Sequence, residues 1–432
     1  MNLLHNLLYF FFPIDTFKAV FSLLYPFYKD WWWIITPPVL FFVAHDLWLF
    51  YMRWKRFLAT EHVLLEIKIP KIVERTPKAM EQVFSGLHAL WDEPRMLEKY
   101  LQGKYQVWAS VELVSIDGVT HFYIQLPRAL KNLVQSHVWA QYPEAEISEA
   151  EDYAKKVPQD IPNKNWDIWG TELVLAKDDV YPIRTYPAFE ETVEERRIDP
   201  LASLLEVFGS LGPGEQFWLQ WIIEPVVSGW HEKGKQVVDD LISRKKVKKQ
   251  SGLGRLFSES SSAISLVVAP PPSAAIKKEK PKDEPPSLMM HLSPGEKEVI
   301  AAIELNISKI GFRTGARAIY VGRREVFNKA NAAGFFGAIR QFNTQNLNSI
   351  KPNIGTMPKT LYVMGKQRNF FRKRRLLRLY RLRFFTHKKF IFNVEELATV
   401  YHFPGAMVAM APMVSRIEAK KGEPPTTLPI TS

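Results

Sequence analysis

The chain has 432 residues, of which 47% are hydrophobic, and a formal net charge of +12. This length suggests two or three domains, and the hydrophobic content is sufficient for packed cores. Because the sequence contains no cysteine, disulfides, a thiol nucleophile and thiolate zinc sites are excluded. The positive charge favours an acidic partner such as nucleic acid or anionic lipid.

An apolar stretch from Trp31 to Met52 predicts a transmembrane helix. It has roughly the 20 residues that a hydrocarbon core requires. Tryptophan and tyrosine lie at its ends, as in the aromatic belts of membrane proteins. Three of the next four residues are basic, so the positive-inside rule places the C-terminal domains in the cytoplasm. We therefore expect a membrane anchor over residues 1–58, with its span at about 31–52, in the inner cell membrane.

Four residues inside this stretch are unusual for a span, namely Pro37, Pro38, His45 and Asp46. The two prolines would kink the helix, and an ionised Asp46 would be costly in lipid. We expect Asp46 to lie near the interface or to be capped by His45, and the alternative is a polar contact between spans.

Residues 60–150 predict a first α+β domain with the order β-α-β-β-α-β. Val63 to Ile69 alternates apolar and polar residues, as a half-buried strand does. Pro77 then suits the first position of a helix. Asp117-Gly118 is a hairpin signal between two further strands. A second helix and a short last strand complete the ferredoxin-like order.

A second, looser copy is expected over residues 165–250 and 291–364. Thr171 to Ala176 and Tyr181 to Tyr186 read as strands, and Ser293 begins a capping box ahead of an apolar helix. Residues 251–290 are rich in Ser, Pro, Lys and Glu, so we expect a disordered linker there. The predicted fold class is α+β, with an N-terminal transmembrane anchor, two ferredoxin-like units and a disordered insertion.

Residues 365–432 form a basic and aromatic segment with a C-terminal connector. No acidic residue occurs between Gly365 and Lys389, and phenylalanine and tyrosine are interleaved with the basic residues. Such a segment can bind phosphates and stack on bases. The alternatives to nucleic-acid binding are an acidic partner protein, anionic lipid, or a solvated helix face whose leucines lie in the core. The candidate binding residues are Arg368, Arg372, Lys373, Arg374, Arg375, Arg378, Arg381 and Arg383.

Catalytic motifs are missing from the sequence. There is no G-x-x-x-x-G-K-[ST] phosphate loop, no G-x-S-x-G elbow and no zincin motif. Paired carboxylates such as Glu190-Glu191 lie in polar stretches, where solvated surface is the simpler interpretation. We therefore expect no enzyme activity, no cofactor, and no catalytic or metal-binding residues.

Several motifs occur in an order typical of a known class of proteins. They include Leu64 to Pro70, Pro213 to Gln216, Asn346 to Ser349, and the closing Glu395-Glu396-Leu397-Ala398 with His402-Phe403-Pro404. This series resembles the N-terminal, non-motor region of membrane-anchored type IV secretion and conjugative DNA-transfer ATPases of the FtsK/HerA-like class. It is especially similar to an uncharacterised domain family found beside such motors in reduced-genome bacteria.

The resemblance implies a non-catalytic, membrane-anchored component of a DNA translocation system. Because the chain ends at Ser432 before a motor, we expect it to tether a separately encoded P-loop ATPase. The expected partners are that ATPase, the lipid bilayer, DNA and further copies of the chain. The residues expected to dock the motor are Glu395, Glu396, His402 and Pro404. The alternative is a stand-alone membrane-tethered nucleic-acid-binding or scaffold protein.

Overall fold

The computed structural model describes residues 14–70, 75–189, 199–227, 229–243, 292–359, 364–386 and 388–405. Two compact units are present. The first is Met1–Glu61 with Asp92–Val107, and the second is His62–Trp91 with Trp108–Ser432. The predicted linker at 251–290 lies outside the described residues, as does the connector from residue 406 onward.

The first unit consists of a long helix and a short one. Helix α2 (Ile14–Ala59) runs for 46 residues, and α4 (Met96–Leu101) contacts it. The Trp48 indole N–H donates to the carbonyl of Tyr100 at 3.0 Å, which joins the two helices. Many large apolar side chains in the C-terminal half of α2 are exposed, Phe41 and Phe42 among them.

The predicted transmembrane span is contradicted by this unit. In the part of the chain that the structure describes, no helix combines the length and apolar character that a membrane span requires. The stretch from Trp31 to Met52 is helical, but tryptophan, tyrosine and proline replace many aliphatic residues in it. His45 Nδ1 and Asp46 Oδ1 lie 3.1 Å apart and add a polar pair. The span predicted at 31–52 is therefore wrong, and the inner-membrane location that was inferred from it loses its support; residues 1–13 of the predicted anchor lie outside the described residues.

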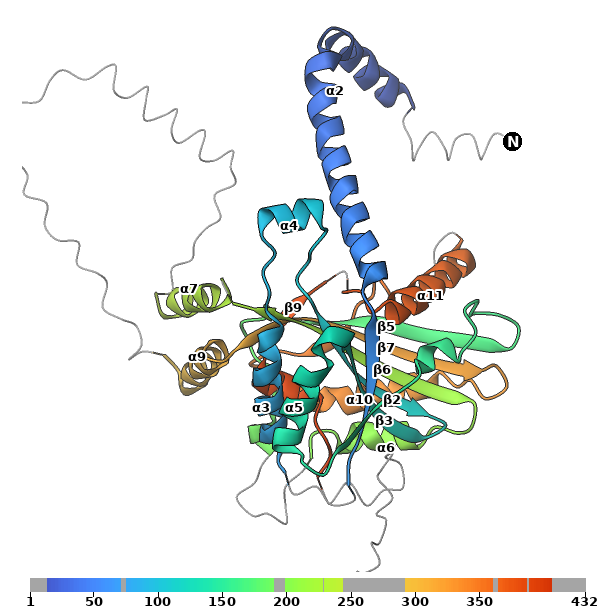
Figure 1. Ribbon diagram of the computed structural model, residues 1–432. Coiled ribbons are helices and arrows are strands. Elements are labelled where there is room, and N and C mark those ends of the chain that lie inside the picture. The colour runs from blue at the N-terminus through green and yellow to red at the C-terminus, as the bar shows by residue number, and fades with distance from the viewer. Residues whose placement is uncertain are drawn as a thin grey trace, which may run out of the picture. The chain divides into compact units, whose positions relative to one another are not determined.

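The second unit is built on one antiparallel sheet of nine strands, drawn in Figure 1, in the order β4-β1-β3-β2-β6-β7-β5-β8 with β9 beside β7. Its first half follows the β-α-β-β-α-β order of a ferredoxin-like unit. Asp117 and Gly118, at φ 52° and 85°, form the tight β2–β3 turn, where glycine adopts positive φ without strain. The elements are β1 (His62–Lys68), α3 (Pro77–Leu87), β2 (Ala109–Ile116), β3 (Val119–Pro127), α5 (Lys131–Gln141) and β4 (Glu146–Glu149).

The second half repeats this arrangement. Its strand order β8-β5-β7-β6 corresponds to β4-β1-β3-β2 in the first half. Strands β2 and β6 pair from Ala109 opposite Ile223 to Ile116 opposite Gln216, so both copies share one continuous sheet. The elements are β5 (Trp166–Leu175), α6 (Ala202–Gly209), β6 (Glu215–Val226), β7 (Gly311–Arg323), α10 (Ala330–Ile339) and β8 (Ile350–Pro352).

Further elements are added to these two copies. Helices α7 (Trp230–Ser243) and α9 (Pro294–Ile307) come between β6 and β7 in the sequence. Helix α11 (Gly365–Arg381), β9 (Phe390–Asn393) and α12 (Val394–Val400) follow the second copy. Short 3-10 helices are η1 (His88–Leu90), η2 (Arg128–Leu130), η3 (Tyr153–Lys155), η4 (Tyr186–Phe189) and η7 (Arg340–Phe342).

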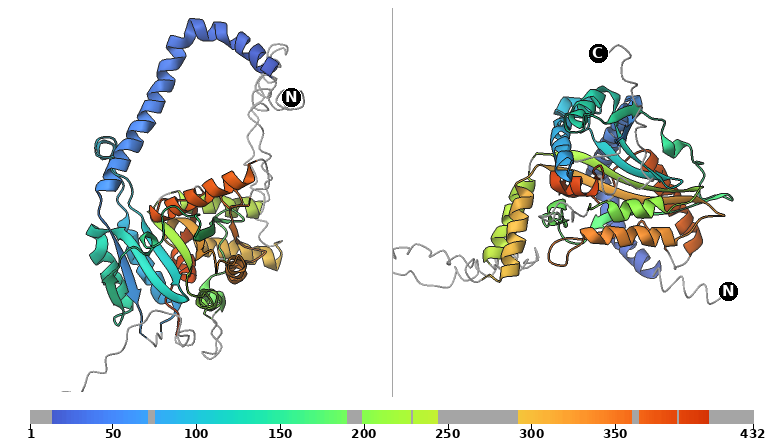
Figure 2. Two further views of the ribbon diagram at one scale, coloured as in Figure 1. Left: turned by 90° about the vertical axis from the view of Figure 1, so that its right-hand side faces the viewer. Right: turned by 90° about the horizontal axis from the view of Figure 1, so that it is seen from below.

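Helices cover the two faces of the sheet unequally. Helices α3, α5, α6, α10 and α12 share one large core with one face, whereas α11 packs on the other with the segment around Tyr153. Figure 2 shows α11 separated from α3 and α5 by the strands. Trp218 and Trp221 of β6 are both fully buried, but they belong to the cores on opposite faces. The unit is therefore α+β, with a basic helix as the main cover of one face.

Candidate nucleic-acid interface

Helix α11 presents two different faces. Leu376, Leu377 and Tyr380 are buried in the core beneath it. On the opposite side Arg368, Phe371, Arg375 and Arg378 are exposed. These four residues recur at intervals of three or four, so they align along one face of the helix. We call them the outer stripe.

A row of polar side chains crosses the sheet beneath α11. In register on neighbouring strands, Glu112 of β2 lies opposite Gln220 of β6, Gln220 opposite Arg317 of β7, and Arg317 opposite Glu172 of β5. We call these four residues the polar row, and none is more than 1% exposed. Gln220 donates to Glu112 at 2.9 Å and accepts from Arg317 at 3.1 Å. Arg317 Nε lies 3.6 Å from Glu172 Oε1.

Arg383 joins α11 to this row. Its Nε donates to Glu112 Oε1 at 2.9 Å, and its Nη1 donates to Asp152 Oδ2 at 2.8 Å. Tyr153 also donates to Glu112, at 2.7 Å, and its hydroxyl lies 2.6 Å from that of Tyr380. Burial raises the pKa of both tyrosines well above the usual value, so both remain hydroxyls. The end of α11 is thus fixed to the sheet by charge-assisted hydrogen bonds.

Five of the eight predicted binding residues form side-chain hydrogen bonds with other residues of the second unit. Arg383 is 5% exposed and belongs to the network just described. The other four reach neighbouring segments: Arg381 donates to the Val157 and Pro158 carbonyls, Lys373 to Asp167, Arg372 to the Met357 carbonyl, and Arg374 to the Asp160 carbonyl. The remaining three, Arg368, Arg375 and Arg378, are the arginines of the outer stripe.

A cleft of about 740 Å³ opens beside α11. Arg372, Arg375, Lys388 and Lys389 supply four cationic side chains to its lining. Glu172, at one end of the polar row, supplies the one carboxylate among the lining residues, and Asn353 and Thr356 add neutral polar groups. Burial lowers the pKa of Lys389, partly offset by the charge of Glu224. We call this hollow the basic cleft. Its four cations make it suited to an anionic ligand.

Sequence reasoning did not find the whole cleft. Lys388 and Lys389 lie in the basic stretch but were not among the expected binding residues, and Asn353 and Thr356 carry no local signal at all. Thr356 reaches the cleft because its hydroxyl accepts a hydrogen bond from the Glu172 backbone N–H at 3.1 Å. Only the tertiary fold brings this loop beside α11.

The four residues expected to dock a motor are all buried. Glu396 completes the capping box of α12 and accepts from the Ile183 backbone N–H at 3.0 Å. His402 Nε2 lies 3.1 Å from Asp199 Oδ1, while its Nδ1 lies 2.8 Å from the Ala398 carbonyl. Glu395 pairs with Lys309. The polar side chains of Glu395, Glu396 and His402 thus bond to other residues of the same chain.

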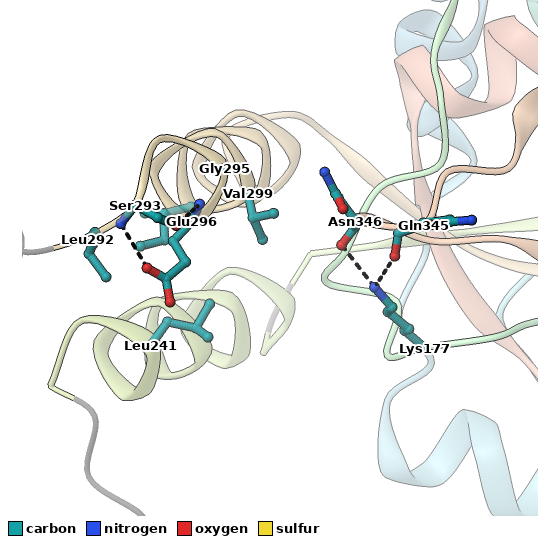
Figure 3. A pocket seen from close by; sticks show the side chains of 10 residues that line it. Lys177, Leu241, Leu292, Ser293, Gly295, Glu296, Val299, Gln345 and Asn346 are labelled. Atoms are coloured by element: carbon teal, nitrogen blue, oxygen red, sulfur yellow. Dashed lines mark hydrogen bonds between the residues drawn. The ribbon is translucent and has the colours of Figure 1, made fainter.

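A second hollow, of about 350 Å³, lies between α7, α9 and the loop at 345–346. Figure 3 shows Lys177 directed at this loop, where its amine donates to the carbonyls of Gln345 and Asn346 at 2.9 and 2.8 Å. The first turn of α9 is capped by Ser293 and Glu296. Lys177, Ser293 and Glu296 of this hollow therefore have partners within the chain. Over the described ranges, no three His, Asp or Glu side chains gather as a metal ion would need.

The Glu112–Arg383 contact yields a prediction about stability. Replacing Arg383→Met should lower the free energy of unfolding by about 3–5 kcal/mol, because the buried Glu112 carboxylate loses its cation. The matched control is Arg378→Met on α11. Because Arg378 is exposed, this substitution should change the free energy of unfolding by less than ~0.5 kcal/mol. Urea denaturation of both variants measures the difference. Equal stability of the two variants would contradict the assigned role of Arg383.

Glu396 yields a prediction about pH. Burial raises its pKa from 4.5 to about 8, against the lowering effect of the hydrogen bonds from the backbone N–H groups of Asn393 and Ile183. Between these two values the unfolded chain ionises this carboxyl and the folded chain does not. Stability should therefore fall as pH rises through this window, by an amount on the order of a few kcal/mol.

Glu396→Gln should remove that dependence, because the amide does not titrate. Urea denaturation at about pH 5 and about pH 8 compares the two proteins. The same loss of stability with pH in both would show that the burial of Glu396 is not its cause.

Comparison with known proteins completes the description of the site. A family model described as a domain of unknown function (DUF8128) matches residues 56–413, which include both copies of the β-α-β-β-α-β order, α11 and α12. A search of curated proteins finds no match. The family description names no activity, so the uncharacterised domain family expected from the sequence is confirmed without a link to secretion motors. The chain belongs to the DUF8128 family.

Proposed function

We propose that the protein is a non-catalytic nucleic-acid-binding component of a type IV secretion-like DNA translocation system, and that α11 provides its nucleic-acid contact. One observation carries the binding role. The inner face of α11 packs on the sheet through Leu376 and Leu377, and Arg383 fixes the end of the helix, while the outer stripe presents three exposed arginines. A cationic face on a rigid support is suited to a phosphate backbone.

The charge of the whole chain supports the same role. A net charge of +12 attracts a polyanion from a distance, and the outer stripe and the basic cleft concentrate positive groups on one helix and its surroundings. Arginine is suited to phosphate because its planar group offers paired donors. The exposed phenylalanine in the outer stripe adds a surface on which a base can stack.

The role beside a P-loop ATPase rests on the sequence resemblance alone. The four residues expected to dock the motor are buried, so this part of the proposal does not depend on them. Purification of the tagged full chain from its own cells, with the bound proteins identified by mass spectrometry, tests it. If the protein is recovered without a P-loop ATPase, its role beside a motor is contradicted. A stand-alone nucleic-acid-binding protein then remains as the proposed function.

Charge reversal on the outer stripe tests the binding role. The double variant Arg375→Glu with Arg378→Glu should weaken oligonucleotide binding by at least ~10-fold and reduce the salt slope by roughly 1.4–1.8, because two phosphate contacts are lost. Fluorescence polarisation between about 50 and 200 mM salt measures both effects.

The matched control reverses Lys235 and Lys297, which are exposed on α7 and α9, to glutamate. It changes the net charge by the same amount, so only the position of the charges differs. Equal weakening by the two double variants would show that the charge of the whole chain, and not α11, governs binding.

A further inference from the structure

The basic cleft adds a property that the outer stripe alone does not have, namely selection for unpaired nucleotides. We propose that α11 and the basic cleft bind single-stranded nucleic acid, with phosphates at the rim of the cleft and one base directed into it. This inference rests on the proposed binding function and specifies its ligand.

Arg375 connects the two surfaces. It belongs to the outer stripe, and it also lines the basic cleft together with Arg372. A strand whose phosphates follow the stripe therefore reaches the cleft without leaving the cationic surface. On the other side, Lys388 and Lys389 continue the positive lining, and the Lys389 amine lies 4.2 Å from the centre of the Phe385 ring.

The charges in the cleft set the orientation of a bound nucleotide. A phosphate deep in the cleft would approach the Glu172 carboxylate, which is 1% exposed and lies 3.6 Å from Arg317 Nε. At the rim it would meet Arg375, Lys388 and Lys389, which are exposed. Coulomb energy thus places the phosphate outside and the base inside, where the side-chain amide of Asn353 offers polar groups to a base edge.

Phe371 provides a second contact that requires an unpaired base. Its ring is 67% exposed and lies in the outer stripe between Arg368 and Arg375. Exposed aromatic rings within a cationic groove are the stacking platforms of proteins that bind single strands. A duplex keeps its base faces inside the stack, so it would contact the arginines but could use neither Phe371 nor the interior of the cleft.

Binding of matched oligonucleotides to the full chain tests this inference. The probes are a labelled single strand of about 16 nucleotides and the duplex of the same sequence. We expect the single strand to bind about tenfold more tightly. Phe371→Ala should remove about tenfold of single-strand affinity and leave duplex affinity within about twofold, while Phe371→Tyr should retain binding because its ring still stacks. Leu305→Ala, which truncates an exposed apolar side chain on α9, is the control.

Each result has a defined meaning. Equal or tighter binding of the duplex, or a Phe371→Ala variant with unchanged single-strand affinity, overturns the inference and leaves nucleic-acid binding in place. Failure of both probes to bind overturns the proposed function itself. Lys388→Glu gives an independent check on the cleft, since it should weaken single-strand binding several-fold more than duplex binding.

Discussion

A buried carboxylate, Glu112, is the constraint on which the surface of this protein depends. It has no exposure and lies in the middle of a sheet, where an unpaired charge would be strongly destabilising. Arg383 supplies the partner charge from just beyond the end of α11. Because this contact fixes the end of the helix, it also fixes which arginines of α11 face the sheet and which face outward. A structural ion pair thereby determines a binding surface.

The register of the sheet extends this constraint across both halves of the unit. Glu112, Gln220, Arg317 and Glu172 meet only because β2, β6, β7 and β5 pair in one register. A slip of one residue would turn each of these side chains to the opposite face. The joining of the two copies through β2 and β6 therefore brings the first copy's carboxylate beneath α11, while the pairing of β5 with β7 places Glu172 beside Arg317.

Local sequence signals were sufficient for much of the fold. The alternation in Val63 to Ile69, the Asp117-Gly118 turn and the capping box at Ser293 each correspond to the observed element, because neighbouring residues determine them. The strand expected at Tyr181 to Tyr186 is not formed. There the backbone N–H groups of Ile183 and Tyr186 donate to the side chains of Glu396 and Thr399, which are more than 200 residues away.

The candidate site shows the same limit. The sequence identified the basic segment, but Arg383 and Arg378 look alike there, and only the distant Glu112 makes one of them structural. The polar side chains of Glu396 and His402, in the motif from Glu395 to Pro404, bond to groups far away in the sequence, which the motif alone does not reveal. The apolar, aromatic stretch of α2 has the length of a span but not the required apolar character.

Photo-crosslinking tests the central claim most directly, because it identifies the residues that touch the ligand. A single-stranded oligonucleotide carrying 5-iodouracil would be bound to the full chain and irradiated, and the linked peptides identified by mass spectrometry. The account predicts crosslinks at Phe371 and in the segments that line the basic cleft. Crosslinks confined to other surfaces, with α11 unmodified, would contradict it.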